Sequence, residues 1–180
     1  MACSRDLESI QSHPVFGPRT PDDESARLQS LNNLRILDTD RDPAFDRLTK
    51  LASEMFSVPI AFISFIDDSR QWFKSRQGSD LFETSREAAF CAHTILADEV
   101  TIVLNASEDE RFRLNPLVCG EPRIRFYAGA PITTAEGHRV GSLCIIDTVP
   151  RKSFTKKQQR MLLALADLVV QALATHKAKR

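Results

Sequence analysis

Residues 115–132 read Asn-Pro-Leu-Val-Cys-Gly-Glu-Pro-Arg-Ile-Arg-Phe-Tyr-Ala-Gly-Ala-Pro-Ile, and residues 141–147 read Gly-Ser-Leu-Cys-Ile-Ile-Asp. The first part, up to residue 122, contains asparagine, proline, glycine and charged residues, which are typical of a loop. Residues 124–132 and 140–146 are mostly apolar, and the polar turn between them contains a glycine. This pattern predicts an antiparallel pair of buried strands that follows a polar loop.

Three helices are predicted around this strand pair. Residues 21–37 begin with acidic residues and continue with leucines three positions apart, which favours a first helix. Asp42 is a predicted N-cap, and Pro43 suits the first position of a second helix that continues to about residue 55. Thr155 and Gln158 form a capping-box pattern ahead of a third helix that runs to about residue 175. The apolar stripe of this last helix is wide, so we expect a dimer partner to cover part of it.

Further strands and a short helix are predicted from the apolar runs in between. Residues 58–66 are almost wholly apolar and suit a central strand that is buried on both faces. Residues 71–77 alternate in polarity and are predicted to form an outer strand, in a hairpin with the first. Residues 86–96 are predicted as a short helix, and residues 100–104 as a short strand. Residues 105–122 form a long polar connection, which is typical of a binding loop or lid.

The composition excludes several classes of protein. The chain has 180 residues, of which 42% are hydrophobic, and this is enough for one compact domain. We expect a flexible tail at residues 1–21, a single domain at residues 22–176 and a short tail at residues 177–180. The 24 basic and 24 acidic residues cancel, so no net charge attracts nucleic acid. No apolar run approaches the roughly 20 residues of a membrane span, and the N-terminus lacks the apolar core of a signal peptide, so we expect a cytoplasmic protein.

Several short strings carry a resemblance to a known family. They are Gln-Trp-Phe-Lys-Ser at residues 71–75, Phe-Cys-Ala-His-Thr-Ile at 90–95, Asp-Glu-Arg-Phe at 109–112, Asn-Pro at 115–116, Ile-Arg-Phe-Tyr-Ala-Gly-Ala-Pro at 124–131 and Gly-Ser-Leu-Cys-Ile-Ile-Asp-Thr at 141–148. With these strings, the chain from about residue 22 to 175 resembles the bacterial GAF domains that are often fused to histidine kinases and diguanylate cyclases. The resemblance implies an α+β fold in which a six-stranded antiparallel sheet carries the N- and C-terminal helices on one face and a ligand pocket on the other.

The resemblance also implies where a small ligand binds, namely under a roof made by the short helix and the long loop. The implied pocket residues are Phe62, Phe73, Lys74, Cys91, His93, Thr94, Asp109, Phe112, Asn115, Arg125 and Tyr127. The chain departs from the subgroup at Asn105-Ala106, where Asp-Ala is expected, and so lacks one carboxylate. No metal or other cofactor is predicted, because no histidine and cysteine cluster provides four ligands. On a helix, Cys91 and His93 would project about 200° apart, too far to share a metal.

The arginines near the second strand allow two interpretations. Arg123 and Arg125 are predicted to lie on the same strand face as Tyr127. They can pair with acids of the long loop, such as Asp109 or Glu121. Alternatively, their planar guanidinium groups can recognise an anionic ligand, with Lys74 of the neighbouring strand adding a further positive charge.

We therefore expect a sensory domain in bacterial signal transduction that binds a small molecule, has no catalytic output of its own and forms a homodimer through its terminal helices. Ligand binding would order residues 105–122 and shift the helix at 155–175, which passes the signal to a separate kinase or cyclase. Two alternatives stay open. One is a thiol enzyme similar to the free methionine sulfoxide reductases, in which Cys91 and Cys119 act as the nucleophilic and resolving thiols, while Cys144 belongs to the core. The other is a protein-interaction module whose pocket is filled by its own side chains.

Overall fold

A computed structural model describes residues 17–178 of the chain, so most of the predicted N-terminal tail and the last two residues lie outside the described residues. Six strands form one antiparallel sheet in the order β3-β2-β1-β6-β5-β4. The strands are β1 (Ile60–Ile66), β2 (Arg70–Gln77), β3 (Glu83–Ser85), β4 (Thr101–Val103), β5 (Phe126–Thr133) and β6 (Arg139–Asp147). This architecture confirms the predicted GAF-like α+β fold.

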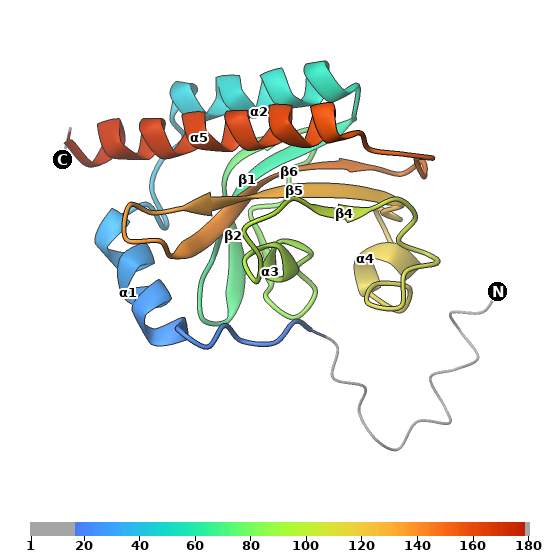
Figure 1. The fold of residues 1–180 in the computed structure, drawn as a ribbon, viewed down its shortest axis with the longest axis horizontal. Coiled ribbons are helices and arrows are strands. Elements are labelled where there is room, and N and C mark those ends of the chain that lie inside the picture. The colour runs from blue at the N-terminus through green and yellow to red at the C-terminus, as the bar shows by residue number, and fades with distance from the viewer. Residues whose placement is uncertain (1–16, 179–180) are drawn as a thin grey trace.

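Two long helices, α2 (Pro43–Phe56) and α5 (Lys156–Ala178), lie side by side on one face of the sheet (Figure 1). The local sequence explains where α2 begins, because the Asp42 side chain accepts a hydrogen bond of 2.9 Å from the backbone N–H of Ala44. The α2–α5 face of the sheet contains the larger hydrophobic core. It includes Phe45 of α2, Phe126 and Ile145 of the sheet, and Leu162 of α5, each fully buried.

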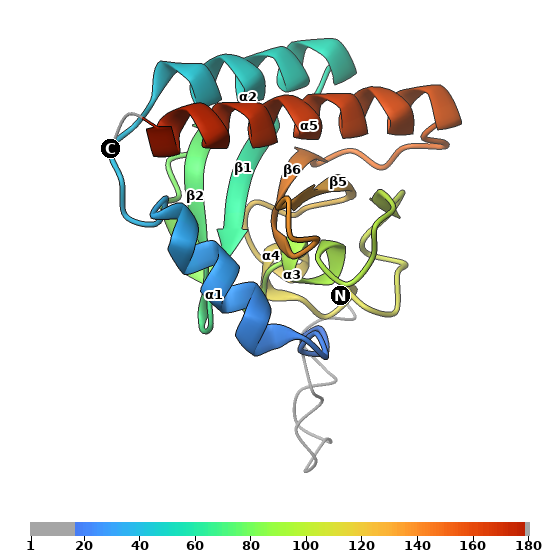
Figure 2. The ribbon, with the colours of Figure 1, turned by 60° about the vertical axis from the view of Figure 1, so that its left-hand side comes forward.

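The first helix, α1 (Glu24–Leu34), lies away from the α2–α5 layer, near one end of the sheet (Figure 2). Arg27 of α1 is 1% exposed, and its guanidinium donates 2.7 Å hydrogen bonds to the Glu24 carboxylate and to the carbonyl oxygen of Ile66. Glu24 also accepts a hydrogen bond from Arg86. This largely buried ion-pair network connects α1 to the end of β1 and to the segment around Arg86.

Two short helices, α3 (Cys91–Thr94) and α4 (Pro116–Cys119), lie on the other side of the sheet (Figure 1). A second hydrophobic cluster forms between them and the sheet, and it includes Phe62, Phe112, Tyr127 and Cys144. Helix α4 begins where the Asn115 side chain accepts a hydrogen bond from the N–H of Leu117, followed by Pro116 at the first helical position. Among the described residues, no helix is long and apolar enough to cross a membrane.

The structure corrects several predicted elements. Strand β2 is not an outer strand, because β3 pairs with it and five of its central residues are buried. The predicted helix at 86–96 is helical only at α3, with turns on both sides, and the loop at 105–122 contains α4. The strand predicted from residue 124 begins at Phe126, because Arg123 has a left-handed φ of 62° and the chain is still turning there. Helix α5 continues to Ala178, past its predicted end at about residue 175.

Candidate functional site

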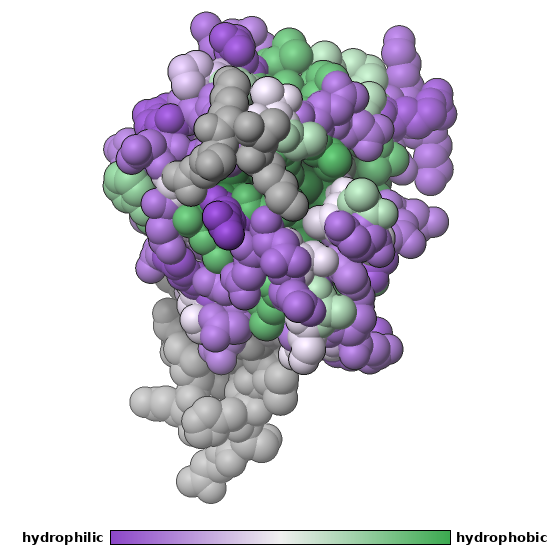
Figure 3. Space-filling view, turned by 90° about the vertical axis from the view of Figure 1, so that its left-hand side faces the viewer, coloured by the Kyte–Doolittle hydropathy of each residue, from purple (hydrophilic) through white to green (hydrophobic). Residues whose placement is uncertain are grey.

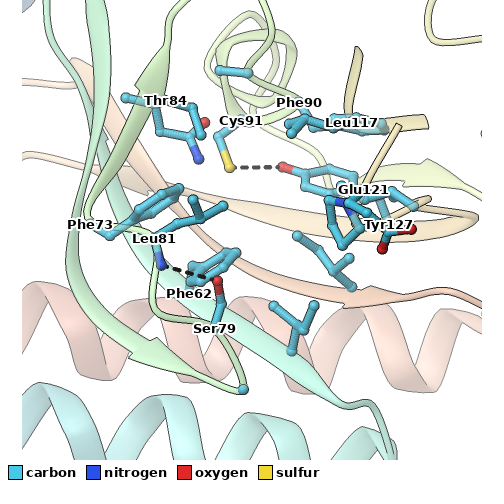
Figure 4. A pocket seen from close by; sticks show the side chains of 17 residues that line it. Phe62, Phe73, Ser79, Leu81, Thr84, Phe90, Cys91, Leu117, Glu121 and Tyr127 are labelled. Atoms are coloured by element: carbon cyan, nitrogen blue, oxygen red, sulfur yellow. Dashed lines mark hydrogen bonds between the residues drawn. The ribbon is translucent and has the colours of Figure 1, made fainter. Parts of the chain in front are cut away.

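A cavity of about 290 Å³ lies between the sheet and the α3–α4 side of the molecule (Figure 4). Its floor consists of residues from the four strands β1, β2, β5 and β6, and its roof comes from the segments around α3 and α4 and from the loop after β2. The lining residues include Ile60, Phe62, Gln71, Phe73, Ser79, Leu81, Thr84, Ala89, Phe90, Cys91, Leu117, Glu121, Pro122, Ile124, Tyr127 and Ile146. Because strand side chains alternate, only every second residue of a strand reaches this side of the sheet.

Aromatic rings build much of the wall. Phe62 and Phe73 stack with their centroids 4.4 Å apart, and Phe90 is 5.2 Å from the Tyr127 ring. Phe112 does not line the cavity, but it stacks behind Phe90 at 4.1 Å and holds that ring in place. Pairs at these distances are favourable contacts that also fix the shape of the walls.

Two polar side chains of the lining have unsatisfied atoms. Gln71 is 5% exposed, and its Oε1 atom has no hydrogen-bond partner among the described residues. The same holds for Oγ1 of Thr84, which stands opposite Gln71 in the pairing of β2 with β3. A buried acceptor without a donor costs free energy, so these two atoms favour a ligand or water that supplies hydrogen bonds.

The lining carries little charge. Three ionisable residues line this cavity within the part of the chain that the structure describes. They are Cys91, Tyr127 and Glu121, and only Glu121 has a carboxylate. The Glu121 side chain is 86% exposed and pairs with Arg123 at 3.4 Å, so it marks the rim. Among the described residues, the cavity lining therefore has no cationic group that could hold an anionic ligand.

A small buried cluster of polar groups lies at the α3 end of the cavity. The Sγ atoms of Cys91 and Cys144 are 3.6 Å apart, and both residues are buried. The Tyr127 hydroxyl donates to Cys91 Sγ at 3.4 Å, as Figure 4 shows, and it shares a hydrogen bond of 2.6 Å with the Thr94 hydroxyl. The cluster joins α3 to strands β5 and β6.

The two thiols of this cluster differ in acidity. Burial raises the pKa of Cys144 well above its usual value, and its contact with Cys91 raises it further. Burial also opposes ionisation of Cys91, but the contacts with Cys144 and with the hydroxyls of Ser142, Ser64 and Tyr127 outweigh it and lower its pKa to about 6. Cys91 is therefore the thiol of the pair that ionises more readily.

The structure brings four of the eleven predicted pocket residues to the cavity. Phe62, Phe73, Cys91 and Tyr127 line it. Thr94 does not reach the cavity, but its hydroxyl holds that of Tyr127. Contact between these residues and a ligand stays a prediction.

Lys74 was wrongly predicted to lie in the pocket. Its ammonium group donates to the Thr39 hydroxyl at 2.8 Å and lies 5.4 Å from the centre of the Phe45 ring, on the α2 side of the sheet. The physical reason is strand alternation, because Phe73 points into the cavity and its neighbour must point to the opposite face.

Other predicted pocket residues lie near the roof but outside the lining. The His93 ring packs edge-on against Phe112 at 4.6 Å, and burial together with the charge of Arg111 lowers its pKa to about 4. Asp109 forms an ion pair of 2.7 Å with Arg111, and the hydrogen bonds from Arg111 lower the pKa of the Asp109 carboxyl. Asp109 and Arg111 pair with each other within the loop, and neither of them lines the cavity.

Asn115 and Arg125 also serve the protein itself. Asn115 caps α4 through its side-chain oxygen, and its amide donates to the carbonyl oxygen of Ala88 at 3.0 Å, which connects the loop to the α3 segment. The Arg125 guanidinium donates to the carbonyl oxygens of Val118 and Ile124. The Arg125 guanidinium, which was predicted at the pocket, therefore binds backbone carbonyl oxygens around α4.

The thiol arrangement also differs from the predicted one. Cys91 lies against Cys144, not against Cys119. The sulfur of Cys119 is 3.4 Å from the carbonyl oxygen of Arg113, and Cys119 does not line the cavity. Among residues 17–178, no three histidine, cysteine or acidic side chains gather as a metal ion would require. Gln71 and Thr84 were missed by the sequence reasoning, although Gln71 could have been found from its strand alternation with Phe73.

Known proteins resemble this chain in sequence or in fold. Over 158 residues the chain is 44% identical to a cyclic di-GMP phosphodiesterase of Pseudomonas aeruginosa; the match covers 88% of this chain but only 27% of that protein. The GAF domain of an Acinetobacter phosphoenolpyruvate-protein phosphotransferase superposes with a TM-score of 0.62 at 18% identity, covering 83% of this chain and 95% of that one. A free methionine-R-sulfoxide reductase from Neisseria meningitidis gives a TM-score of 0.62 at 12% identity, covering 93% and 99%.

The two solved structures show only that the fold is shared. Their sequences are too different from this chain to indicate a shared activity. The family profile described as GAF domain matches residues 40–173, which is most of the chain and includes the whole sheet. The chain therefore belongs to the GAF domain family, a family of small-molecule-binding sensory domains.

Proposed function

We propose that the cavity binds a small, uncharged, largely apolar molecule, and that this domain thereby regulates cyclic di-GMP signalling. The observation that carries the proposal is the pairing of aromatic walls with the unsatisfied Oε1 atom of Gln71. Ligand sites in proteins are commonly apolar cavities with a few well-placed polar groups. A volume of about 290 Å³ is at the small end of the usual range for such sites.

The polar atoms define the ligand more closely. Gln71 Oε1 requires a donor, so the ligand should carry an amide, amine or hydroxyl hydrogen at that end. The Thr84 hydroxyl can donate or accept, and it lies beside Gln71 at the paired positions of β2 and β3. The rest of the molecule should be apolar and flat enough to lie against Phe62 and Phe73.

An anionic nucleotide does not suit this cavity. Phosphates are usually held by arginine, lysine or clustered backbone N–H groups. Lys74 lies on the other face of the sheet, and Arg125 donates to carbonyl oxygens of the backbone. The cyclic di-GMP link therefore rests on the 44% identical relative, and we assign cyclic di-GMP itself to an output partner, not to this cavity.

The signal would pass from the cavity through the sheet. Tyr127 of β5 and Ile146 of β6 line the cavity, while their neighbours Phe126 and Ile145 belong to the core on the α5 side. Leu117 and Pro122 of the long loop also line the cavity, so a ligand would contact the loop and the strands together. A ligand that prefers one arrangement of these strands shifts the position of α5 by mass action.

The outer face of the α2–α5 layer is the proposed dimer surface. Leu51 and Met55 of α2 are each 41% exposed, and Leu168 of α5 is 42% exposed. Figure 3 shows one side of the molecule, with many hydrophilic residues and with hydrophobic residues both near the top, where α2 and α5 lie in Figure 1, and in the middle of this face. The proposed form of the domain is a cytoplasmic homodimer whose output partner is a separate kinase or cyclase.

The dimer is tested by analytical ultracentrifugation of Leu168→Lys, with Val149→Lys as a matched control on an exposed apolar residue outside the two helices. We expect the native chain and the control to sediment as dimers and Leu168→Lys as a monomer. A native chain that sediments as a monomer at all concentrations would remove the dimer from the proposal.

The ligand class is tested with benzamide and benzoate as probes, followed by NMR chemical shifts. Both are aromatic and similar in size, but only benzamide is neutral and can donate an N–H to Gln71. We expect benzamide to shift resonances of Phe62, Phe73 and Ile146, and benzoate to leave them unchanged. Gln71→Leu should weaken benzamide binding about fivefold to tenfold, the cost of one hydrogen bond.

Gln77→Leu is the matched control, because Gln77 is exposed at the end of the same strand and does not line the cavity. It should bind benzamide like the native protein. Equal binding of both probes, or no loss in Gln71→Leu, would contradict the proposed ligand class.

A further inference from the structure

We propose that Cys91 and Cys144 form a reversible disulfide when a hydroperoxide enters the cavity, so that the pocket wall is a redox-modification site. This goes beyond the proposed ligand function, because it requires only the two thiols and access to one of them.

Proximity is the first support. The two Sγ atoms are 3.6 Å apart, although the residues are 53 positions apart in the sequence. A disulfide requires a sulfur–sulfur distance of about 2.05 Å, so the sulfurs must approach by roughly 1.5 Å. Cys91 is in a helix of only four residues with turns on both sides, which can move more easily than strand β6.

Access is the second support, and it assigns different roles to the two thiols. Cys91 lines the cavity, as Figure 4 shows, whereas Cys144 does not line it. A small molecule in the cavity therefore meets the sulfur of Cys91 first. Cys144 is placed behind it, where it can attack an oxidised Cys91.

The surroundings of Cys91 favour its thiolate. The hydroxyl of Tyr127 donates to its sulfur at 3.4 Å. The buried hydroxyls of Ser64 on β1 and Ser142 on β6 have no hydrogen-bond partner among the described residues, and both lower the pKa of Cys91. The contact with Cys144 and these hydroxyls together lower the pKa of Cys91 to about 6, against the effect of burial. The thiolate is the form that reacts with peroxides.

The chemistry balances in two steps. The Cys91 thiolate attacks one oxygen of the hydroperoxide, so an S–O bond forms as the O–O bond breaks and the alcohol leaves with the proton that the thiol lost. The sulfur of Cys144 then attacks the sulfur of Cys91, and hydroxide leaves with the Cys144 proton as water. In sum, two thiols lose two protons and two electrons, and the hydroperoxide is reduced to an alcohol and water. A dithiol reductant reverses the disulfide by exchange.

The disulfide would join α3 directly to β6. The sulfur of Cys91 would move away from the hydroxyl of Tyr127 and from the cavity wall. Helix α3 contributes to the roof of the cavity, so oxidation would change the shape of the pocket.

The test is peptide mapping of the native protein after exposure to tert-butyl hydroperoxide. The free thiols are alkylated with iodoacetamide in denaturant, and the protein is digested with trypsin. We expect the peptides of residues 87–111 and 140–151 to appear as one species, lighter by two hydrogens than their sum. Dithiothreitol should separate them again. Full alkylation of both cysteines after oxidant, or a link from Cys91 to a different cysteine, would overturn the proposal.

Two single substitutions assign the roles. In Cys144→Ser, Cys91 should accumulate as a sulfenic acid that dimedone traps, while the native protein should form little of this adduct. In Cys91→Ser, Cys144 should remain fully alkylatable after the same exposure. Circular dichroism checks that each variant is folded, and the cross-linked peptide of the native protein decides the proposal if either variant is not. A dimedone adduct on Cys144 in Cys91→Ser would contradict the order of the two steps.

Discussion

The hydroxyl groups of Tyr127 and Thr94 lie 2.6 Å apart and are fully buried, so one hydrogen bond connects strand β5 to helix α3. Tyr127→Phe removes this bond and leaves the Thr94 hydroxyl without its partner. We expect the free energy of unfolding to fall by about 1–2 kcal/mol, because a buried hydroxyl then lacks a hydrogen bond. Urea denaturation measures the difference. An unchanged midpoint would show that this hydrogen bond does not hold α3 on the sheet.

Gly129 tests the same packing from the other direction. A Cβ atom at this position would clash with the Tyr127 hydroxyl and come within 2.8 Å of Thr94 Oγ1. We expect Gly129→Ala to cost about 1–3 kcal/mol of folding free energy, as overpacking usually does. On the Tyr127→Phe background the cost should be smaller, because the clashing hydroxyl is gone. Equal costs on both backgrounds, measured in a double-mutant cycle, would contradict this packing.

Ile145 and Ile146 are neighbours on β6 that face opposite environments. Ile145 is fully buried in the core under α5, whereas Ile146 lines the cavity. Ile145→Phe should lower the free energy of unfolding by about 1–3 kcal/mol, since a close-packed core cannot accept a larger ring. Ile146→Phe should cost less than about 1 kcal/mol, because the ring can enter the cavity. Thermal unfolding of both variants checks the comparison, and equal losses would argue against an open cavity.

The pH dependence of stability should reveal Glu24. Burial raises the pKa of this carboxyl, but hydrogen bonds from Arg27 and Arg86 lower it to about 2, below its usual value of 4.5. The folded pKa is depressed, so the stabilisation is present above pH 4.5 and is lost as the pH falls toward 2. Glu24→Gln should lack this loss and be less stable at pH 7 by roughly 1–3 kcal/mol, because Arg27 is left buried without its counter-charge.

A surface ion pair provides the control for this prediction. Glu54 pairs with Lys50 at 3.9 Å, and both side chains are about two-thirds exposed, at 66% and 67%. Glu54→Gln should change stability by less than about 0.5 kcal/mol at any pH. Acid unfolding followed by circular dichroism compares the variants, and similar curves for Glu24→Gln and Glu54→Gln would contradict the network.

His93 should destabilise the fold in mild acid. Burial and the charge of Arg111 lower its pKa to about 4, from 6.5. The unfolded chain therefore binds a proton that the folded chain does not, so stability falls as the pH is lowered from about 6.5 to about 4. An NMR titration of the His93 ring measures the folded pKa directly. Titration near 6.5, or an unchanged pH slope in His93→Gln, would contradict the packing of His93 against Phe112.

The stronger sequence patterns predicted their elements well. Strand β1 follows an apolar run, and the N-cap Asp42 with Pro43 places the start of α2 where the structure has it. Strand β3 was missed because it has only three residues. They are exposed or half-exposed and show no apolar pattern. Helix α4 was missed because its one turn lies inside a polar loop, and a single turn has too few positions to show a helical period.

The candidate site was predicted less completely. Of the predicted ligand-binding residues, Phe62, Phe73, Cys91 and Tyr127 line the cavity, and their contact with a ligand stays a prediction. Lys74 failed because the prediction did not apply strand alternation after Phe73. Arg125 was expected at the pocket, but the backbone is left-handed at Arg123, and the Arg125 guanidinium donates to nearby backbone carbonyl oxygens.

The sequence by itself determined the local structure and the family. Apolar periodicity and helix caps depend on residues close together in the chain, and the family was identified from short sequence strings. Only the tertiary structure decided that Cys91 meets Cys144 and that Gln71 Oε1 is left without a donor. Both depend on how α3 packs on β6 and on the register of the sheet. Such contacts join segments far apart in the chain, and a side chain's spacing within its own segment carries no information about them.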